Sequence, residues 1–242
     1  MIHALVFLVA MVYAAVGHGG ASGYLAVLAT FTTASPAQMS TTALLLNLLV
    51  AGCAWKTFWH AGHGSVRLIW PFLVSSIPCA IVGGWLRVSS PIYEGLLAVV
   101  LAFAAGRLVL SRWSASTPEV VRQPRHTLAL LVGGAIGLIS GIVGVGGGIF
   151  LSPLMIVCRW ADAKQTAAVS ACFIVLNSVA GLLGRVTAGP LDGTLALGVI
   201  VPALAGGLLG SRLGAGVLPK PALCRMLAGV LMIAITTSVM RP

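Results

Sequence analysis

Two dense glycine clusters, each inside a long apolar segment, are the part of this sequence best suited to chemistry. The second cluster, Gly141–Pro153, reads GIVGVGGGIFLSP and has five glycines in its first eight positions. The first cluster, Gly17–Tyr24, reads GHGGASGY. Glycine accepts positive φ and leaves its backbone uncovered, so we expect both helices to open there. Backbone N–H groups freed at the start of the next helix bind anions, helped by the helix dipole.

We predict that the two clusters face each other and hold one small anion. Asparagine inside an apolar run needs a polar partner and faces the interior of a helix bundle, which adds Asn47 and Asn177 to the site. The candidate binding residues are Gly17, His18, Gly19, Gly20, Ser22, Asn47, Gly144, Gly146, Gly147, Gly148, Ser170, Asn177, Arg87 and Arg212. Two alternatives stay open, because the glycines could serve only close helix packing and the asparagines only hydrogen bonds between helices.

The charged candidates also have more than one interpretation each. His18 lies inside a glycine cluster and could donate to the anion, change its protonation state or be a structural donor. Arg87 and Arg212 each follow a glycine pair. They could attract an anion, or reach the membrane surface from a helix end.

The composition shows which elements must position these residues. Of the 242 residues, 59% are hydrophobic and 7% are charged, and the mean hydropathy is +1.06; a soluble domain has about 25% charged residues. Most stretches between charged residues are apolar runs of the roughly 20 residues that cross a bilayer as a helix. The sequence lacks the alternating pattern of a membrane β-barrel. We therefore predict an all-α integral membrane protein.

The apolar runs predict about eight transmembrane segments. They cover residues 2–33, 41–57, 68–86, 92–110, 127–157, 166–186, 194–212 and 221–240. Segments 2–33 and 127–157 exceed the roughly 17–25 residues of one crossing, and each contains a glycine cluster. We therefore predict a glycine-broken first helix in each half of the chain. Single crossings would make the two halves parallel, whereas re-entrant segments would invert them.

Matching landmarks indicate an internal repeat. The glycine clusters align at an offset of 127 residues, which also pairs Gln38 with Gln165. Asn47 and Asn177 each follow a serine by seven positions. The predicted parts are a first membrane repeat over 1–110, a polar connecting loop over 111–126 and a second membrane repeat over 127–242, which form one transport domain. Glycine-interrupted segments at corresponding positions of two halves are typical of a transporter's substrate site.

The distribution of charge predicts an orientation if every segment crosses once. Lys and Arg then number eight on the side that holds the N-terminus, the loops 58–67, 111–126 and 187–193 and the C-terminus, and six on the other side. The positive-inside rule places both termini in the cytoplasm. The predicted location is the inner (cytoplasmic) membrane, which the chain crosses several times.

Several classes of function are disfavoured. The net charge of +10 comes from Lys and Arg scattered singly between apolar runs, as in membrane anchors, so no nucleic-acid partner is expected. The five cysteines lack the close spacing of a metal site. The four carboxylates, Glu94, Glu119, Asp162 and Asp192, fall at segment ends or in loops, which disfavours a cation transporter. With no phosphate loop and no recognisable nucleophile and base, we predict no enzyme activity, cofactor or metal.

At these residues the sequence resembles the sulfite exporter TauE/SafE family of membrane permeases. The resemblance rests on Gly144–Leu154, Gly17–Gly23, Ala168–Ser170 and the segment from Pro202 to Gly210, and it covers essentially the whole chain in order. It implies a duplicated helical bundle that exports sulfite or related small sulfur-containing or organic anions. The first half departs from the family pattern, because GHGGASGY replaces a run that ends in proline.

The residues and the resemblance together predict a secondary transporter, an exporter of small anions such as sulfite, other sulfur oxyanions or small organosulfonates. An anion channel and a non-transport membrane subunit that uses the glycines for helix packing remain alternatives. The expected partners are a small anionic solute and the lipid bilayer, and a homodimer is compatible with the sequence.

Overall fold

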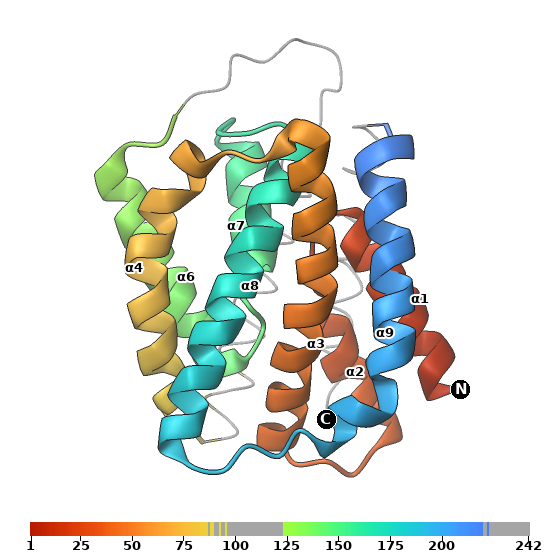
Figure 1. The fold of residues 1–242 in the computed structure, drawn as a ribbon. Helices are drawn as coiled ribbons and strands as arrows, with labels where there is room; N and C mark the ends of the chain where they lie inside the picture. Colours follow the sequence, from red (N-terminus) through yellow and green to blue (C-terminus); the bar gives the residue numbers. More distant parts are fainter. Residues whose placement is uncertain (87, 90–91, 93–94, 96–122, 220–221, 223–242) are drawn as a thin grey trace.

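The structure, a computed structural model, describes residues 1–86, 88–89, 92, 95, 123–219 and 222. Within these residues every regular element is a helix (Figure 1). In chain order they are α1 (Ile2–Ala15), α2 (Ala21–Phe31), α3 (Pro36–Phe58), η1 (Trp59–His63), α4 (Val66–Trp85), α6 (His126–Val143), α7 (Gly148–Val157), α8 (Ala163–Ala188), α9 (Thr194–Arg212) and η2 (Leu213–Val217). The all-α prediction is confirmed for the described part of the chain, while the predicted segments 92–110 and 221–240 fall almost wholly outside it.

Five helical stretches of the described chain are long and apolar enough to cross a membrane. They are Ala37–His63, Val66–Trp85, His126–Val143, Ala163–Ala188 and Thr194–Val217. The apolar helices α1 and α7 have 14 and 10 residues, fewer than the roughly 20 that one crossing needs. The chain is therefore a multi-pass helical membrane protein that also contains short helices ending inside the bundle.

The two longest helices, α3 and α8, begin at side-chain caps at matching positions. Ser35 and Gln38 form a capping box at the start of α3. Asp162 accepts hydrogen bonds from the backbone N–H groups of Lys164 and Gln165 at the start of α8. Because these caps satisfy N–H groups that have no partner within the helix, they fix where the central pair of helices starts.

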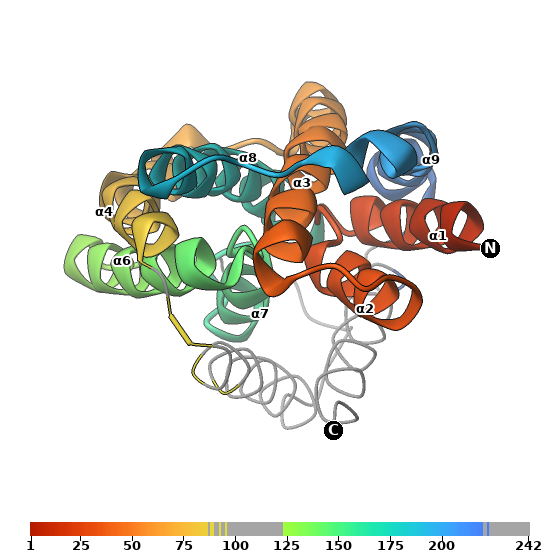
Figure 2. The same ribbon diagram turned by 90° about the horizontal axis from the view of Figure 1, so that it is seen from below.

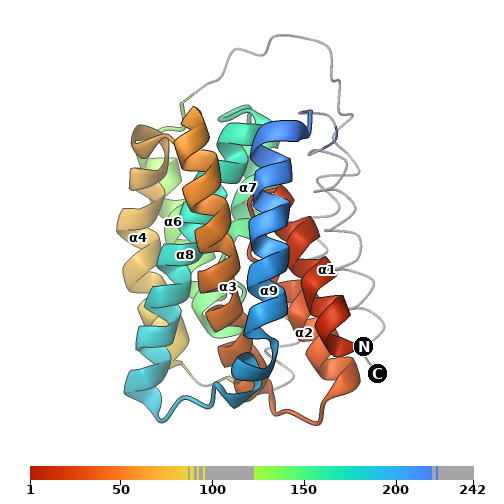
Figure 3. The same ribbon diagram turned by 45° about the vertical axis from the view of Figure 1, so that its right-hand side comes forward.

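Both long apolar segments fold back on themselves at their glycine clusters. After α1, the chain turns at residues 16–20 and α2 returns beside it (Figures 1 and 3). The antiparallel pairing is shown by Tyr13, whose hydroxyl lies 2.7 Å from Ser22 Oγ, and by Gly23, which packs against Val9. In the same way, α6 turns at residues 144–147 and α7 returns. We call residues 16–20 the first tip and residues 144–147 the second tip.

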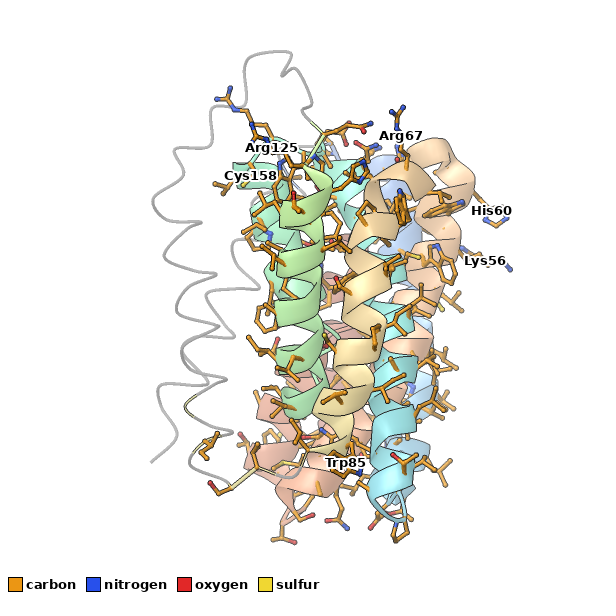
Figure 4. All side chains as sticks on the ribbon, turned by 90° about the vertical axis from the view of Figure 1, so that its left-hand side faces the viewer. Lys56, His60, Arg67, Trp85, Arg125 and Cys158 are labelled. Carbon is orange, nitrogen blue, oxygen red and sulfur yellow. The ribbon has the colours of Figure 1, made fainter. Side chains whose placement is uncertain are left out.

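The two helical hairpins enter the bundle from opposite faces. The α1–α2 hairpin starts and ends at the face that holds Met1, whereas Arg125 and Cys158, at the two ends of the α6–α7 hairpin, lie at the other face (Figures 1 and 4). Of the two arrangements that the sequence left open, the hairpins favour re-entrant segments, because each hairpin returns the chain to the face from which it came. The loop sides counted for single crossings do not apply to this arrangement.

Glycines bring two pairs of helices into close contact. The hairpins lie in one row and α8, α3 and α9 in a second row (Figure 2). Along α6, and along α9 and the following η2, glycines recur every four residues, and a Cβ on any of them would overlap a backbone carbonyl of the parallel neighbouring helix. These glycines are Gly133, Gly137 and Gly141 against α4, and Gly206, Gly210 and Gly214 against α1. Small residues allow helix backbones to approach this closely in membranes.

This packing predicts opposite outcomes for two glycines of one helix. A Cβ at Gly137 would overlap the backbone of Ser76, whereas a Cβ at Gly134 would lie 3.5 Å from Cys79 Sγ, an ordinary contact. We expect Gly137→Ala to lower the free energy of unfolding by about 1–3 kcal/mol, as overpacking does, and Gly134→Ala to change it by less than about 1 kcal/mol. Thermal unfolding in detergent measures both, and equal effects would contradict the packing.

Positive charge gathers at one face of the bundle. Among the described residues, six of the seven Lys and Arg side chains lie on the ends of helices or in the connections at the face that holds η1. They are Lys56, Arg67, Arg125, Arg159, Lys164 and Arg212. Figure 4 shows three of them at one end, with Trp85 at the other. The seventh, Arg185, is near the opposite end of α8.

Candidate functional site

The two glycine tips meet beside the middle of α3 and α8, and both are buried. Gly17 (φ 78°) and Gly144 (φ 81°) end α1 and α6 in the left-handed conformation. Their N–H groups bond back to Ala14 O at 3.1 Å and Ser140 O at 2.8 Å, as in helix C-caps that glycine favours. A Cβ at Gly17 would also overlap the backbone of Ala167 in α8. Glycine therefore allows the chain to turn at both tips, and at Gly17 it also allows the close approach of Ala167.

Asn47 of α3 joins the two tips. Its Oδ1 accepts a hydrogen bond of 3.1 Å from the N–H of Ala21, the first residue of α2. Its Nδ2 donates a hydrogen bond of 3.1 Å to Val145 O in the second tip. The side chain is 1% exposed and fits between Gly19 and Gly146, where a Cβ would displace it. One neutral side chain therefore bridges Ala21 and Val145, two residues that are far apart along the chain.

Asn177 of α8, the residue that matches Asn47 in the repeat, has different partners. Its Nδ2 donates to Phe173 O at 2.9 Å and to Ser76 Oγ at 3.1 Å. A carbonyl oxygen only accepts, so this bond fixes which amide atom is nitrogen. Its Oδ1 is buried and has no hydrogen-bond partner. The two predicted asparagines therefore differ in this conformation, because Asn47 forms hydrogen bonds with the tips and Asn177 forms them elsewhere.

A chain of polar side chains connects the first tip to α7 and α8. His18 Nδ1 lies 3.0 Å from Val16 O, and His18 Nε2 lies 3.2 Å from Ser152 Oγ. Ser152 Oγ donates to Ser170 Oγ over 2.6 Å. His18 is 1% exposed, and its ring adjoins the backbone of Gly148, the first residue of α7. The histidine of the glycine cluster thus lies where the first tip contacts the start of α7.

The carbonyl groups at the end of α6 already accept hydrogen bonds. Arg185 Nη2 donates to Gly141 O at 3.2 Å and to Ile142 O at 3.0 Å, a position where a cation also interacts favourably with the helix dipole. Ser40 Oγ donates to Val143 O at 3.4 Å. In contrast, the first N–H groups of α2 and α7 have no partner within their own helices. The site therefore offers donors more readily than acceptors.

Described carboxylates lie away from the tips. Asp162 caps the start of α8. Asp192 lies in the connection to α9, where Gln38 Nε2 donates to it over 2.6 Å. Hydrogen bonds from Gln38 and Thr194 hold the pKa of Asp192 below its ordinary value, so it is ionised at neutral pH. Within the described part of the chain, no carboxylate competes with an anion at the tips.

Most of the predicted site residues come together at the tips. The residues brought there are Gly17, His18, Gly19, Gly20, Ser22, Asn47, Gly144, Gly146, Gly147, Gly148 and Ser170. Asn177 lies one turn along α8 from Ile174, which contacts Gly146 and Gly148. Arg212 is exposed at the end of α9, apart from the tips. Arg87 lies outside the described residues.

Two polar residues at the site were missed from the sequence. Ser152 was part of the glycine motif but was not singled out, and it has no serine at the matching position of the first half, which holds Leu25. Arg185 was counted as a loop charge. It stands inside the predicted segment 166–186, and an arginine within an apolar segment is a signal of function that could have identified it.

Comparisons with known proteins agree with this architecture. The family model described as sulfite exporter TauE/SafE matches residues 2–238. The chain is 34% identical over 230 residues to the "Probable membrane transporter protein y4hK" of Sinorhizobium fredii, a match that covers 94% of this chain and 93% of that protein. No solved structure matches the chain.

Proposed function

The chain belongs to the sulfite exporter TauE/SafE family, and from this premise we propose that it is a secondary transporter that exports small anions such as sulfite, other sulfur oxyanions or small organosulfonates. Its membership of a family of membrane transporters agrees with the prediction that it is not an enzyme. The proposed binding site consists of the two tips and the side chain of Asn47.

The observation that carries this proposal is the position of Asn47 Oδ1 at the start of α2. This neutral oxygen accepts a hydrogen bond of 3.1 Å from the N–H of Ala21. An oxygen of an anion would bind at the same place, at the positive end of the helix dipole. The amide of the same residue donates to the second tip. We infer that an arriving anion replaces Oδ1 at the N–H of Ala21. The Asn47 side chain is then released from the start of α2, and its hydrogen bond to Val145 O in the second tip changes.

Cation transport is less well supported by the same geometry. A desolvated cation needs carboxylates or free carbonyl oxygens. In the described residues the nearby carbonyls of Gly141, Ile142 and Val145 already accept hydrogen bonds from Arg185 and Asn47. The remaining groups at the starts of α2 and α7 are donors. A small anion therefore fits these groups better than a cation.

Flux in proteoliposomes tests the proposed function. Purified protein would be assayed with sulfite, sulfate, thiosulfate, sulfoacetate and simple carboxylates. We expect saturable flux of at least one sulfur-containing anion, and its accumulation against a gradient under some imposed ion gradient. Flux that never accumulates solute would indicate a channel, and no flux with any anion would indicate a packing subunit.

We propose that the chain is an inverted repeat in the inner (cytoplasmic) membrane, with repeats over 1–110 and 127–242 joined by 111–126. The opposite entry of the two hairpins supports inversion over a parallel repeat, because inverted halves place glycine-broken helices at one central site. Six of seven described Lys and Arg side chains lie at the face of η1. By the positive-inside rule this face is cytoplasmic, and Met1 lies at the opposite face. A homodimer remains compatible with this arrangement.

A further inference from the structure

Both ring nitrogens of His18 lie within hydrogen-bond distance of an oxygen atom. Nδ1 lies 3.0 Å from Val16 O, a carbonyl with no hydrogen to donate. Nε2 lies 3.2 Å from Ser152 Oγ, and the single hydrogen of that hydroxyl is donated to Ser170 Oγ. A neutral imidazole carries only one N–H. With Ser152 donating to Ser170, the arrangement fits the doubly protonated, positively charged ring. With Ser152 turned to donate to Nε2, it fits the neutral ring that carries its hydrogen on Nδ1.

A positive charge at this place needs a negative partner. His18 is 1% exposed, and an unpaired buried charge is costly. Its ring adjoins the backbone of Gly148, the first residue of α7. Among the carboxylates that the structure describes, Asp162 accepts from backbone N–H groups at the start of α8 and Asp192 is exposed near α9. The anion proposed to bind at the tips is the partner that remains.

We infer that His18 is a proton-binding site and that a proton and the anion bind together. This inference rests on the proposed function and deepens it, because it names the ion that accompanies the anion. Binding of the anion stabilises the charged ring, and by reciprocity the charged ring raises the affinity for the anion by the same factor. Each anion then passes through the site with one proton on His18 Nε2.

The serine pair lets His18 gain and lose this proton without movement of heavy atoms. In the charged state Nε2–H donates to Ser152 Oγ, and Ser152 donates to Ser170 Oγ. When the proton leaves Nε2, the Ser152 hydroxyl turns to donate to the bare nitrogen, and the Ser170 hydroxyl turns to donate to Ser152. Hydroxyl hydrogens rotate to suit their partners. The distances of 3.2 Å between His18 Nε2 and Ser152 Oγ and 2.6 Å between Ser152 Oγ and Ser170 Oγ suit a hydrogen bond in either direction.

The described helices around His18 carry several other titratable side chains. They are His3 and Tyr13 of α1, Tyr24 of α2, Cys53 and Lys56 of α3, Cys158 at the end of α7, and Lys164, Cys172 and Arg185 of α8. The hydroxyl of Tyr13 bonds Ser22, and Lys164 Nζ donates to Ala215 O over 2.9 Å. The ring of Tyr24 packs over Gly20. His3, the other histidine on these described helices, is exposed at the start of α1, where its Nε2 lies 3.0 Å from Gly198 O.

The pH dependence of anion affinity tests this inference. The apparent affinity for sulfite would be measured in proteoliposomes between about pH 6 and pH 8, where histidine titrates, for wild type, His18→Gln and His126→Gln. Sulfite changes its own charge in this range, so the quantity compared is the ratio of wild type to variant. For His18→Gln we expect that ratio to rise by up to about tenfold for each unit of pH decrease, as one linked proton requires. For His126→Gln, an exposed residue at the start of α6, it should stay flat.

A direct measurement keeps the inference separate from the transport proposal. With His3, His60, His63 and His126 replaced by Gln, His18 is the remaining histidine, and NMR of isotope-labelled histidine reports whether one or both nitrogens carry hydrogen. Sulfite should shift His18 toward the doubly protonated form. A ring that stays neutral with sulfite bound, or a flat ratio for His18→Gln, would overturn the proton site while leaving anion transport intact. Absence of flux in wild type would instead overturn the proposed function, and the NMR result would still decide the protonation of His18.

Discussion

Replacement of Asn47 by Asp is expected to abolish anion transport while the protein still folds. The carboxylate keeps the acceptor oxygen that Asn47 Oδ1 offers to Ala21 N at 3.1 Å, and its charge suits the start of α2. It therefore becomes a tethered competitor for the anion. Two unit charges about 4 Å apart interact with about 4 kcal/mol at an effective dielectric constant of about 20. This corresponds to a loss of affinity of about a thousandfold, measured as sulfite flux in proteoliposomes.

The neutral variant Asn47→Ala separates this charge effect from loss of structure. It removes both bridging hydrogen bonds and leaves Ala21 N and Val145 O without their partner, which costs about 1–3 kcal/mol of stability for each buried group left unsatisfied. It adds no charge, so we expect it to bind sulfite more tightly than Asn47→Asp. If both variants lost transport equally, or if Asn47→Asp transported sulfite like wild type, the start of α2 would not be the anion site.

The fold could be predicted from the sequence wherever the length and spacing of apolar residues decide it. The segments 41–57, 68–86, 166–186 and 194–212 correspond to α3, α4, α8 and α9. The breaks at both glycine clusters were also predicted, because glycine adopts a positive φ, such as that of Gly144, without the steric cost that a side chain brings. The direction that the chain takes after each break was not predicted. A helix that continues and a helix that folds back have the same hydrophobic pattern, and only contacts such as Tyr13 to Ser22 separate them.

The sequence predicted which types of residue form the site, but not which hydrogen-bond partners these residues have. Asn47 and Asn177 occupy matching places in the sequence, and nothing in their spacing indicates that only Asn47 bridges the tips. Their hydrogen bonds depend on neighbours distant in the chain, Val145 for one and Ser76 for the other. The asymmetry has a physical interpretation, because two similar halves that are packed differently can exchange conformations. In the secondary transporter that we propose, alternating access would take the form of an exchange in which Asn177 assumes the bridging role.

The sidedness of labelling provides the sharpest test of the architecture, because its outcome is all or none. Single cysteines would replace Thr33, His60, His126 and Leu191, all exposed in connections or at helix ends, in a protein without its native cysteines. We expect a membrane-impermeant maleimide to label Thr33→Cys and Leu191→Cys from one side of the membrane. His60→Cys and His126→Cys should be labelled only from the other side. The hydrogen bond between Gln38 and Asp192 already brings the connections at Thr33 and Leu191 together at one face.

The same four variants separate hairpins from single crossings. If residues 2–33 crossed the membrane once, Thr33 and Leu191 would lie on opposite sides, and His60 would share a side with Leu191. That labelling pattern would contradict the two hairpins and the inverted repeat. Absolute orientation follows from vesicles of known sidedness, in which the positive-inside rule predicts that His60→Cys and His126→Cys react from the cytoplasmic side. None of the four substitutions changes the number of Lys or Arg side chains, so the charge that orients the protein is the same in every variant.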